Sequence, residues 1–208
     1  MTTYLVTGGT GFLGRHLVEL LTGRDDAKVL VLVRAGSVAK LARLGDRVEP
    51  LIGDLTEPLL GVGDDDRDRL RDQVDHFVHL AALYDMTADA ATNEATNIGG
   101  TGEALRLAAD INATRFHHVS SVAVAGEYDG TFTEDMFDEA QHLPSAYHAT
   151  KFEAERLVRE QSDIPWRVYR PAIVVGHSST GAMDKIDGPY YFFPALARLA
   201  QLPSWLPL

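Results

Sequence analysis

The sequence predicts an α/β protein whose core is a doubly wound sheet of parallel strands. Three observations lead to this prediction. Strand-like and helix-like stretches alternate along the 208 residues, as they do in repeated strand–helix–strand units. The run from Val29 to Val33 is continuously apolar and rich in β-branched residues, which suits a parallel strand covered on both faces. A glycine-rich turn joins the first strand-like run to the first helix-like run.

The expected elements follow one another in chain order. Strands are expected at residues 3–7, 28–33, 47–52, 75–81, 115–121 and 166–170, and helices at 12–23, 37–44, 66–73, 94–110, 145–161 and 190–201. The first strand corresponds to the apolar run Tyr4-Leu5-Val6. The first helix corresponds to apolar residues at helical spacing, among them Phe12, Leu13, Leu17, Val18, Leu20 and Leu21. The acidic region 61–75 is expected to be a solvated loop and an exposed helix.

Composition limits the classes of function. The formal net charge of −11 makes the chain a poor binder of polyanions, so we expect no nucleic acid as a partner. The chain contains no cysteine, which excludes disulfides, thiolate metal sites and a cysteine nucleophile. The sequence shows neither a signal peptide nor an apolar stretch of membrane length, and we expect a soluble, cytoplasmic protein with no transmembrane segment. The adjacent His117 and His118 would point to opposite faces of a strand, and no metal site is expected.

The glycine-rich turn is the most informative motif. Its residues are Thr7, Gly8, Gly9, Thr10, Gly11, Phe12, Leu13 and Gly14. The glycines fit both the G-x-x-G-x-x-G and the G-x-G-x-x-G spacing. Glycine adopts positive φ cheaply and lets a pyrophosphate approach the backbone, and the N–H groups at a helix N-terminus attract the anion. A glycine-rich turn without a ligand is the alternative, but the flanking strand and helix favour a dinucleotide-binding loop.

A second motif, Tyr147-x-x-x-Lys151, lies within the expected helix 145–161. The i, i+4 spacing places both side chains on one helix face. An ammonium close to a phenol stabilises the phenolate and lowers its pKa from about 10, so that the tyrosine can exchange a proton near neutral pH. An accidental pair on an exposed helix is the alternative. The glycine loop earlier in the same chain favours the catalytic interpretation.

Two serines, Ser120 and Ser121, end the expected strand 115–121. The carboxyl ends of strands line the ligand crevice in open α/β sheets. A serine at that place can donate a hydrogen bond to a reacting carbonyl oxygen. A serine that merely ends a strand in a turn is the alternative, which we favour for Ser120.

The motifs together resemble the short-chain dehydrogenase/reductase superfamily, in its extended branch. The resemblance covers nearly the whole chain, through TGGTGFLG at 7–14, GDL at 53–55, HLAAL at 79–83, Asn97 within TNIGGT, SSVAVAG at 120–126, YHATK at 147–151 and RPAIVVG at 170–176. It implies a Rossmann fold that binds NAD(P) over residues 1–176. It also implies the start of a C-terminal substrate-binding lobe over residues 177–208, with most of that lobe absent from the chain.

The resemblance implies a role for each matched catalytic residue. Tyr147 would be the general acid/base. Lys151 would hold the nicotinamide ribose and tune the tyrosine. Ser121 matches the substrate-polarising serine of the family, because its spacing to Gly126 fits better than that of Ser120.

The resemblance likewise implies a cofactor site beyond the glycine loop. Asp54, beside Leu55, would accept a hydrogen bond from the adenine amino group, with an Asx-type turn as the alternative. Asn97 would brace the region behind the active site. The remaining residues would line the adenosine ribose or border the nicotinamide: Leu80, Ala81 and Ala82 in the first case, and Pro171, Ala172, Ile173 and Val174 in the second.

The end of the second strand indicates which nicotinamide cofactor is bound. In NAD-binding folds of this type, an acid about twenty residues past the loop binds the ribose 2′-OH. Arg34 stands near that position here, and Lys40 and Arg43 lie on the next expected helix. A guanidinium can pair bidentately with a 2′-phosphate, so NADP(H) is favoured. A solvated arginine at the end of a strand is the alternative, which would leave NAD(H) possible.

Within the extended branch, the chain looks most like the fatty acyl reductase, male sterility and thioester reductase group. The pointers are TGGTGFLGRHLVELL at the N-terminus, GDLTEPLLG at 53–61, HLAALYDM at 79–86 and MDKIDGPYYFF at 183–193. This likeness implies an NADPH-dependent reductase of fatty acyl thioesters, with the acyl group on CoA or on a carrier and with aldehyde or alcohol as the product.

Other functions remain open at this point. A nucleotide-sugar epimerase or dehydratase, or a hydroxysteroid-type dehydrogenase, would share the same core and would bind NADH more tightly than NADPH. A non-catalytic dinucleotide-sensing module would use the fold without chemistry, but the set Ser121, Tyr147 and Lys151 argues against it. A homodimer is a possible assembly.

Overall fold

A computed structural model describes residues 1–81, 95–181, 183, 190 and 192–199. The chain divides into two compact units, Met1–Ala172 and Ile173–Leu208. In the second unit, helix α6 spans Phe193–Leu199, and the backbone N–H of Gly176 donates to the hydroxyl of Tyr190 at 2.7 Å. The sequence predicts the boundary after residue 176, and that placement stays a prediction.

The first unit is built on one parallel sheet, as the sequence predicts. Its six strands are ordered β3-β2-β1-β4-β5-β6, and all neighbouring pairs are parallel. The strands are β1 (Thr2–Thr7), β2 (Ala27–Val33), β3 (Val48–Ile52), β4 (His76–His79), β5 (Phe116–Val119) and β6 (Trp166–Tyr169). The chain builds outward from β1 to β3 and then returns beside β1 with β4. This reversal creates the crevice at the carboxyl ends of β1 and β4 in which such sheets bind ligands.

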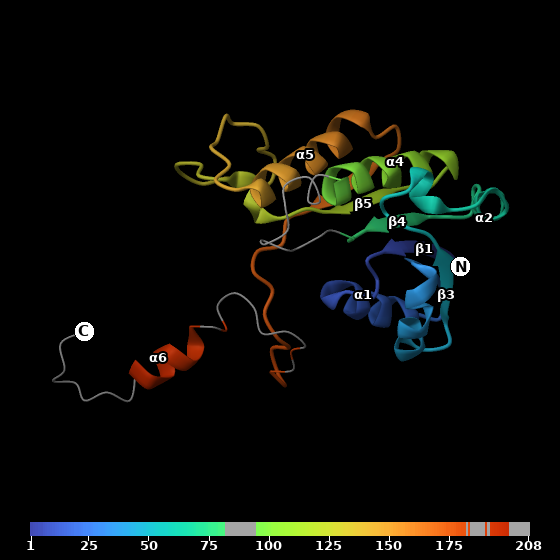
Figure 1. The fold of residues 1–208 in the computed structure, drawn as a ribbon, viewed down its shortest axis with the longest axis horizontal. Coiled ribbons are helices and arrows are strands. Elements are labelled where there is room, and N and C mark those ends of the chain that lie inside the picture. The colour runs from blue at the N-terminus through green and yellow to red at the C-terminus, as the bar shows by residue number, and fades with distance from the viewer. Residues whose placement is uncertain (82–94, 182, 184–189, 191, 200–208) are drawn as a thin grey trace. The chain divides into compact units, whose positions relative to one another are not determined.

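Helices cover both faces of the sheet, with α1 on one face and α4 and α5 on the other (Figure 1). The α-helices of this unit are α1 (Phe12–Thr22), α2 (Asp64–Leu70), α4 (Gly100–Asp110) and α5 (Ala146–Gln161). The short helices are η1 (Ala35–Leu44), η2 (Pro58–Gly61), η3 (Ala95–Gly99) and η4 (Val122–Ala125).

Strand β2 shows why the sheet needs cover on both faces. Leu30 and Leu32 pack into a core with residues of α4 and α5, and Val29, Val31 and Val33 pack into a second core with residues of α1. Side chains alternate between the faces of a strand, so a continuously apolar run is buried on both sides. The prediction made from this run is confirmed.

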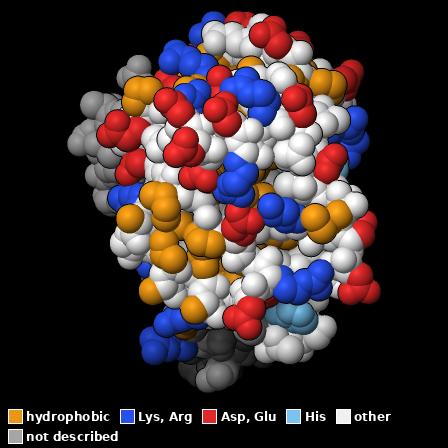
Figure 2. All heavy atoms as spheres, turned by 90° about the vertical axis from the view of Figure 1, so that its right-hand side faces the viewer, with side chains coloured by type: hydrophobic (Ala, Val, Ile, Leu, Met, Phe, Trp, Pro, Cys, Tyr) orange, Lys and Arg blue, Asp and Glu red, His pale blue; other side chains and the backbone are white. Residues whose placement is uncertain are grey.

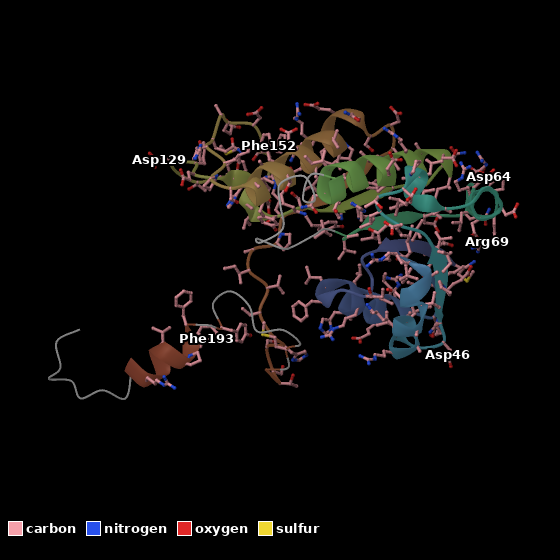
Figure 3. All side chains as sticks on the ribbon, in the orientation of Figure 1. Asp46, Asp64, Arg69, Asp129, Phe152 and Phe193 are labelled. Carbon is pink, nitrogen blue, oxygen red and sulfur yellow. The ribbon has the colours of Figure 1, made fainter. Side chains whose placement is uncertain are left out.

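Several aspartates of the acidic segment before β4 form ion pairs with arginines. Arg67 of α2 forms ion pairs with Asp64 and Asp110, and Arg69 pairs with Asp66. Figure 2 shows acidic and basic side chains interspersed over one face of the molecule, and Figure 3 labels Asp64 and Arg69 near α2. These contacts agree with the expected solvated surface, where ion pairs contribute little to stability.

The structure corrects several element boundaries. The helix expected at 37–44 is a 3₁₀ helix that begins two residues earlier and spans Ala35–Leu44. Strands β4 and β5 end two residues earlier than expected, at His79 and Val119. Helix η2 was not predicted, because a tertiary contact holds it: the N–H of Leu59 donates to the carboxylate of Glu103 at 2.9 Å.

Two histidines are buried between the sheet and the helices α4 and α5. His79 bonds the hydroxyls of Thr7 at 2.8 Å and Thr101 at 3.2 Å. His118 is 2% exposed, and within the described part of the chain neither of its ring nitrogens has a hydrogen-bond partner. Burial lowers the pKa of His79 to about 3 and that of His118 well below its usual value. Both rings are therefore neutral at physiological pH.

The adjacent His117 points to the opposite face of β5, as the sequence predicts. Its ring bonds His76 at 3.0 Å and the hydroxyl of Tyr169 at 3.0 Å. Burial, and then the charge of His76, lowers the pKa of His117 to about 4.

The buried His118 makes the fold sensitive to acid. The unfolded chain protonates this ring near pH 6.5 and the folded chain does not, so stability falls as the pH drops below that value. We expect His118→Leu to reduce the loss of unfolding free energy between pH 7 and pH 4.5 by about 2 kcal/mol, measured by urea denaturation. His16→Leu, at an exposed position, is the control with the smaller change. An equal acid sensitivity of wild type and His118→Leu would contradict this account.

Candidate active site

The sequence-predicted site residues follow the carboxyl ends of neighbouring strands. Backbone bonds continue one residue past the strands at three places: Gly53 N to Val33 O at 3.0 Å, Leu80 N to Thr7 O at 3.2 Å, and Ser120 N to Tyr169 O at 2.8 Å. The glycine loop, Arg34, Asp54, Ala81, Ser121 and Pro171 therefore all emerge at one edge of the sheet. Parallel strands produce this arrangement, because all their carboxyl ends meet at the same edge.

Internal packing requires three of the loop glycines. A Cβ on Gly8, whose φ is +73°, would lie 2.7 Å from the backbone nitrogen of Ala81. A Cβ on Gly9 would lie 2.6 Å from the Val31 side chain, and a Cβ on Gly14 would lie 2.1 Å from the carbonyl oxygen of Gly8. A Cβ on Gly11 would meet Gly8 O at 3.3 Å. The loop is thus packed tightly against β2, α1 and the segment after β4.

The start of α1 fits an anion. Gly11 is the N-cap residue, and the described first turn carries neither a side-chain cap nor an acidic residue. The first N–H groups of a helix have no partner within the helix and carry the positive end of its dipole. Thr10 and Leu13 are exposed at this turn, and the half-buried Phe12 contacts the ring of His16. Contact of these residues with a dinucleotide stays a prediction.

Arg34 lies at the same edge, directly after β2. Its side chain is exposed, and its carbonyl accepts a hydrogen bond from Ser37 N at 2.7 Å at the start of η1. Lys40 and Arg43 of η1 are also exposed. The structure therefore leaves the guanidinium accessible beside the glycine loop.

Asp54 forms the turn that was the alternative to its adenine role. Its Oδ1 accepts hydrogen bonds from the N–H of Thr56 at 3.0 Å and from the Thr56 hydroxyl at 2.8 Å. These bonds, and then the positive charge of Arg34, hold the pKa of Asp54 below its usual range. Contact with adenine stays a prediction for Asp54, and so does cofactor contact for Leu55, which packs partly against the core.

The segment after β4 is joined to β1 by Thr7. The hydroxyl of Thr7 accepts a hydrogen bond from Ala81 N at 3.3 Å and also bonds His79. The Thr7 hydroxyl is thus engaged in hydrogen bonds within the protein. Leu80 and Ala81 are partly buried, and Ala82 lies outside the described residues.

Asn97 lies against the helix that carries Tyr147 and Lys151. It belongs to η3, a single turn of π-helix, and is 2% exposed. Its side-chain amide donates to the hydroxyl of Thr150 at 3.5 Å, and its backbone carbonyl accepts from the hydroxyl of Thr101 at 2.7 Å. The structure therefore places Asn97 beside Lys151's neighbour on α5.

Helix α5 brings Lys151 to the end of β5. Ser145 caps the helix, and its hydroxyl accepts from His148 N at 3.4 Å. Lys151 is 4% exposed, and its Nζ donates to the carbonyl of Val119 at 2.9 Å. Burial lowers the pKa of Lys151 to about 8, and the Glu155 carboxylate opposes that change.

Tyr147 and Ser121 complete the expected catalytic set. Tyr147 is half-buried near the start of α5. Ser121 is half-buried at the N-cap of η4, and its Oγ accepts from Ala123 N at 3.1 Å. A hydroxyl that accepts one bond can still donate its proton. Helices α5 and η4 pack together, so the tyrosine and the serine belong to neighbouring elements.

The residues expected to border the nicotinamide fall in both units. The carbonyl of Pro171 accepts from Val122 N at 3.1 Å, which ties the segment after β6 to η4. Ala172 ends the first unit and is exposed. Ile173 and Val174 belong to the second unit and are 72% and 41% exposed.

Sequence reasoning missed one charged pair of the site region, Glu155 and Arg170. Glu155 is 0% exposed, and its carboxylate bonds Arg170 and Arg159. The signal available in the sequence was an acid four residues after Lys151, on the same helix face.

The described residues contain no group of three or more histidine, aspartate and glutamate side chains placed to hold a metal ion. Among the same residues, no helix is long and apolar enough to cross a bilayer.

Comparison with known proteins yields a family match. The family model described as "Male sterility protein" matches residues 6–208. Glycine betaine reductase ATRR of Emericella nidulans is 36% identical over 212 residues, which cover 89% of this chain and 17% of that protein.

Two solved structures are similar in sequence and fold. The terminal R domain of the myxalamid PKS-NRPS biosynthetic pathway has a TM-score of 0.84 and 31% identity, covering 96% of this chain and 56% of that one. A thiolation-reductase di-domain from an archaeal non-ribosomal peptide synthetase has a TM-score of 0.74 and 25% identity, covering 87% and 43%. The chain thus spans about half of each solved structure and less than a fifth of the fungal reductase.

The packing of the glycine loop can be tested with two helical glycines. Gly14→Ala is expected to lower the unfolding free energy by about 2–4 kcal/mol and to abolish NAD(P) binding, because the added Cβ would collide with Gly8 O. In the described part of the chain, a Cβ on Gly102 of α4 would meet no heavy atom within 4 Å. Gly102→Ala should therefore stabilise the protein by about 1 kcal/mol. Thermal unfolding and cofactor titration measure both effects, and a Gly14→Ala protein as stable as wild type would refute the packing argument.

Proposed function

We propose a function that proceeds from one premise: the chain belongs to the male sterility protein family, within the extended short-chain dehydrogenase/reductase superfamily. We infer that it is the cofactor-binding part of an NADPH-dependent reductase that acts on carrier-bound acyl thioesters. The observation that carries this inference is the docking of Lys151 at the carboxyl end of β5, the same sheet edge at which the glycine loop emerges.

The similar proteins support the substrate class. One matched structure is a terminal R domain of a synthetase pathway, and another joins a reductase to a thiolation domain. A thiolation domain presents its acyl group as a thioester, so the chemistry that fits is reduction of a thioester carbonyl. The fatty acyl chain suggested by the sequence is one member of this class, and aminoacyl and peptidyl chains are others.

The residues at the sheet edge suit proton delivery to a carbonyl oxygen. NADPH, when bound, supplies a hydride to the thioester carbon. Tyr147 would give its phenolic proton to the oxygen as negative charge develops there. Lys151, held by Val119 O, would keep its ammonium next to the phenol and so stabilise the phenolate that remains.

Ser121 would stabilise the same oxygen. Its hydroxyl can donate a proton to that oxygen, because the bond from Ala123 N uses the serine oxygen as acceptor. A donor fixed in place before the reaction stabilises developing charge without reorganisation. The protonated adduct then collapses: its hydroxyl loses its proton as the carbon–sulfur bond breaks, a proton passes to the sulfur, and the aldehyde and the free carrier thiol are released.

The preference for NADPH rests on Arg34. The guanidinium is exposed at the end of β2, where an acid would read the ribose 2′-OH in an NAD-binding protein. It can form two parallel hydrogen bonds to a 2′-phosphate. Lys40 and Arg43 add positive charge on η1.

Cofactor preference can be tested at Arg34. Arg34→Ala is expected to weaken NADPH binding by about 10- to 100-fold, the value of a lost charged hydrogen-bond pair, and to leave NADH binding within about twofold. Arg106→Ala removes an arginine from the surface of α4, where the side chain is 70% exposed, and should change neither affinity. Titration of nucleotide fluorescence gives all the constants. Tighter binding of NADH than NADPH by wild type would reject the assignment of Arg34.

The reaction itself can be tested at Tyr147. In the protein with any further residues that its gene encodes, NADPH oxidation is measured with carrier-bound acyl, aminoacyl and peptidyl thioesters, acyl-CoA, aldehydes and UDP-sugars. We expect turnover of carrier thioesters and aldehydes. Tyr147→Phe should reduce it by at least about 100-fold while NADPH affinity is retained. Tyr4→Phe, on β1, is the matched control.

Each outcome of this assay decides between functions. Oxidation that requires a UDP-sugar would favour the nucleotide-sugar enzymes. Cofactor binding without turnover of any substrate would favour a sensing module. Unchanged turnover by Tyr147→Phe would remove the catalytic role of the tyrosine.

A further inference from the structure

Helix α5 carries a third chemically active side chain on the face of Tyr147 and Lys151. Glu155 follows Lys151 by four residues, so the three side chains lie along one face of the helix. Glu155 is 0% exposed. A buried carboxylate is costly unless hydrogen bonds and opposite charges compensate for lost water. Its partners therefore indicate why the helix keeps it.

Two arginines hold the Glu155 carboxylate. Arg170, directly after β6, donates from Nη2 to Oε1 at 2.6 Å and from Nε to Oε2 at 3.1 Å. This bidentate pair fixes orientation as well as distance. Arg159, on α5 itself, donates from Nε to Oε1 at 2.8 Å. Burial alone would raise the pKa of Glu155, but Arg170, and then Ser120 and Arg159, outweigh it and hold the pKa below its usual range.

Arg170 also reaches the loop between η4 and α5. Its Nη2 donates to the carbonyl of Met136 at 2.8 Å. The next residue, Phe137, stacks on Phe152 of α5 with ring centroids 4.4 Å apart. Figure 3 labels Phe152 on α5, next to the loop that carries Asp129. The clamped carboxylate therefore sits where α5, the end of β6 and this loop meet.

The charges around Lys151 show what else the carboxylate does. Two histidines face Lys151 from the sheet, His79 on β4 and His118 on β5, and both are kept neutral by burial. The arginines bound to Glu155 are positive and disfavour a further cation. Glu155 supplies negative charge that favours the ammonium form of Lys151, in opposition to burial.

We propose that Glu155 is a positioning residue: clamped by Arg170, its carboxylate fixes α5 against the end of β6 and maintains the charge of the Lys151 ammonium. The kinetic consequence rests on the proposed function, whereas the effect on Lys151 does not. Removal of the negative charge makes Lys151 easier to deprotonate. Reduction is lost as Lys151 loses its proton, so the alkaline limb of the pH profile moves to lower pH.

The kinetic test compares the same substitution at two positions of α5. Glu155→Gln is expected to move the alkaline limb of kcat/KM by about one to two pH units, an estimate for a unit charge about 6 Å away at an effective dielectric constant of about 20. Glu153→Gln is the control, because 36% of that side chain is exposed and it pairs with Arg156. A uniform loss of activity with an unchanged alkaline limb would mean a merely structural role and would overturn the proposal.

A second readout needs no activity. The side-chain ¹³C resonance of Lys151 is titrated by NMR in the protein without cofactor and assigned with Lys151→Met among the four lysines of the chain. The midpoint is expected at lower pH in Glu155→Gln than in wild type, and equal midpoints would overturn the proposal. If no thioester is reduced by wild type, the proposed function fails, while this midpoint still decides the role of Glu155.

A third variant covers the case in which Glu155→Gln does not fold. Glu155→Asp keeps the charge but shortens the reach to Arg170. A retained Lys151 midpoint with a kcat reduced several-fold would support the positioning role. An unchanged kcat would overturn it.

Discussion

The site region depends on the burial of one ammonium group. Lys151 is 4% exposed, and it is held by the carbonyl of Val119 and by the field of Glu155. Burial of a charge is tolerated only where hydrogen bonds and an opposite charge offset the loss of water. Here the hydrogen bond from Lys151 to Val119 fixes α5 against the carboxyl end of β5. Helix α5 also carries Tyr147, and Ser121 lies just past the end of β5, so the same contact brings these two residues into one region. The buried ammonium therefore helps to hold α5 beside η4, the turn that follows Ser121.

The cofactor half of the site depends on close packing of backbone. Gly8, Gly9 and Gly14 lie so near Ala81, Val31 and Gly8 O that no side chain fits. This packing sets the first turn of α1 at the crevice between β1 and β4, where an anion can reach free N–H groups. The glycine loop and the end of β5 lie at the same edge of the sheet because all six strands are parallel.

Much of this arrangement is predictable from local sequence. The apolar run at Val29–Val33, the glycine spacing and the pair Tyr147 and Lys151 are signals within single elements, and they predicted the parallel sheet, the turn into α1 and the helix that carries the pair. Contacts between distant segments are not visible in this way. The pair Glu155 and Arg170 meets only after β6 packs beside β5, and the turn of Asp54 onto Thr56 competes with a role that the motif alone suggests. The ring nitrogens of His118, which have no hydrogen-bond partner among the described residues, likewise follow from packing rather than from the place of His118 in β5.

Thioester reduction is tested most directly by tracing the hydride from NADPH into the product. The protein is supplied with NADPH that carries deuterium at the transferred position and with an acyl thioester on its carrier, and the released product is analysed by mass spectrometry. Thioester reduction predicts an aldehyde with one deuterium on its carbonyl carbon, or an alcohol with two, together with a free carrier thiol. Release of an unlabelled carboxylic acid, or no release of the acyl group, would contradict the account.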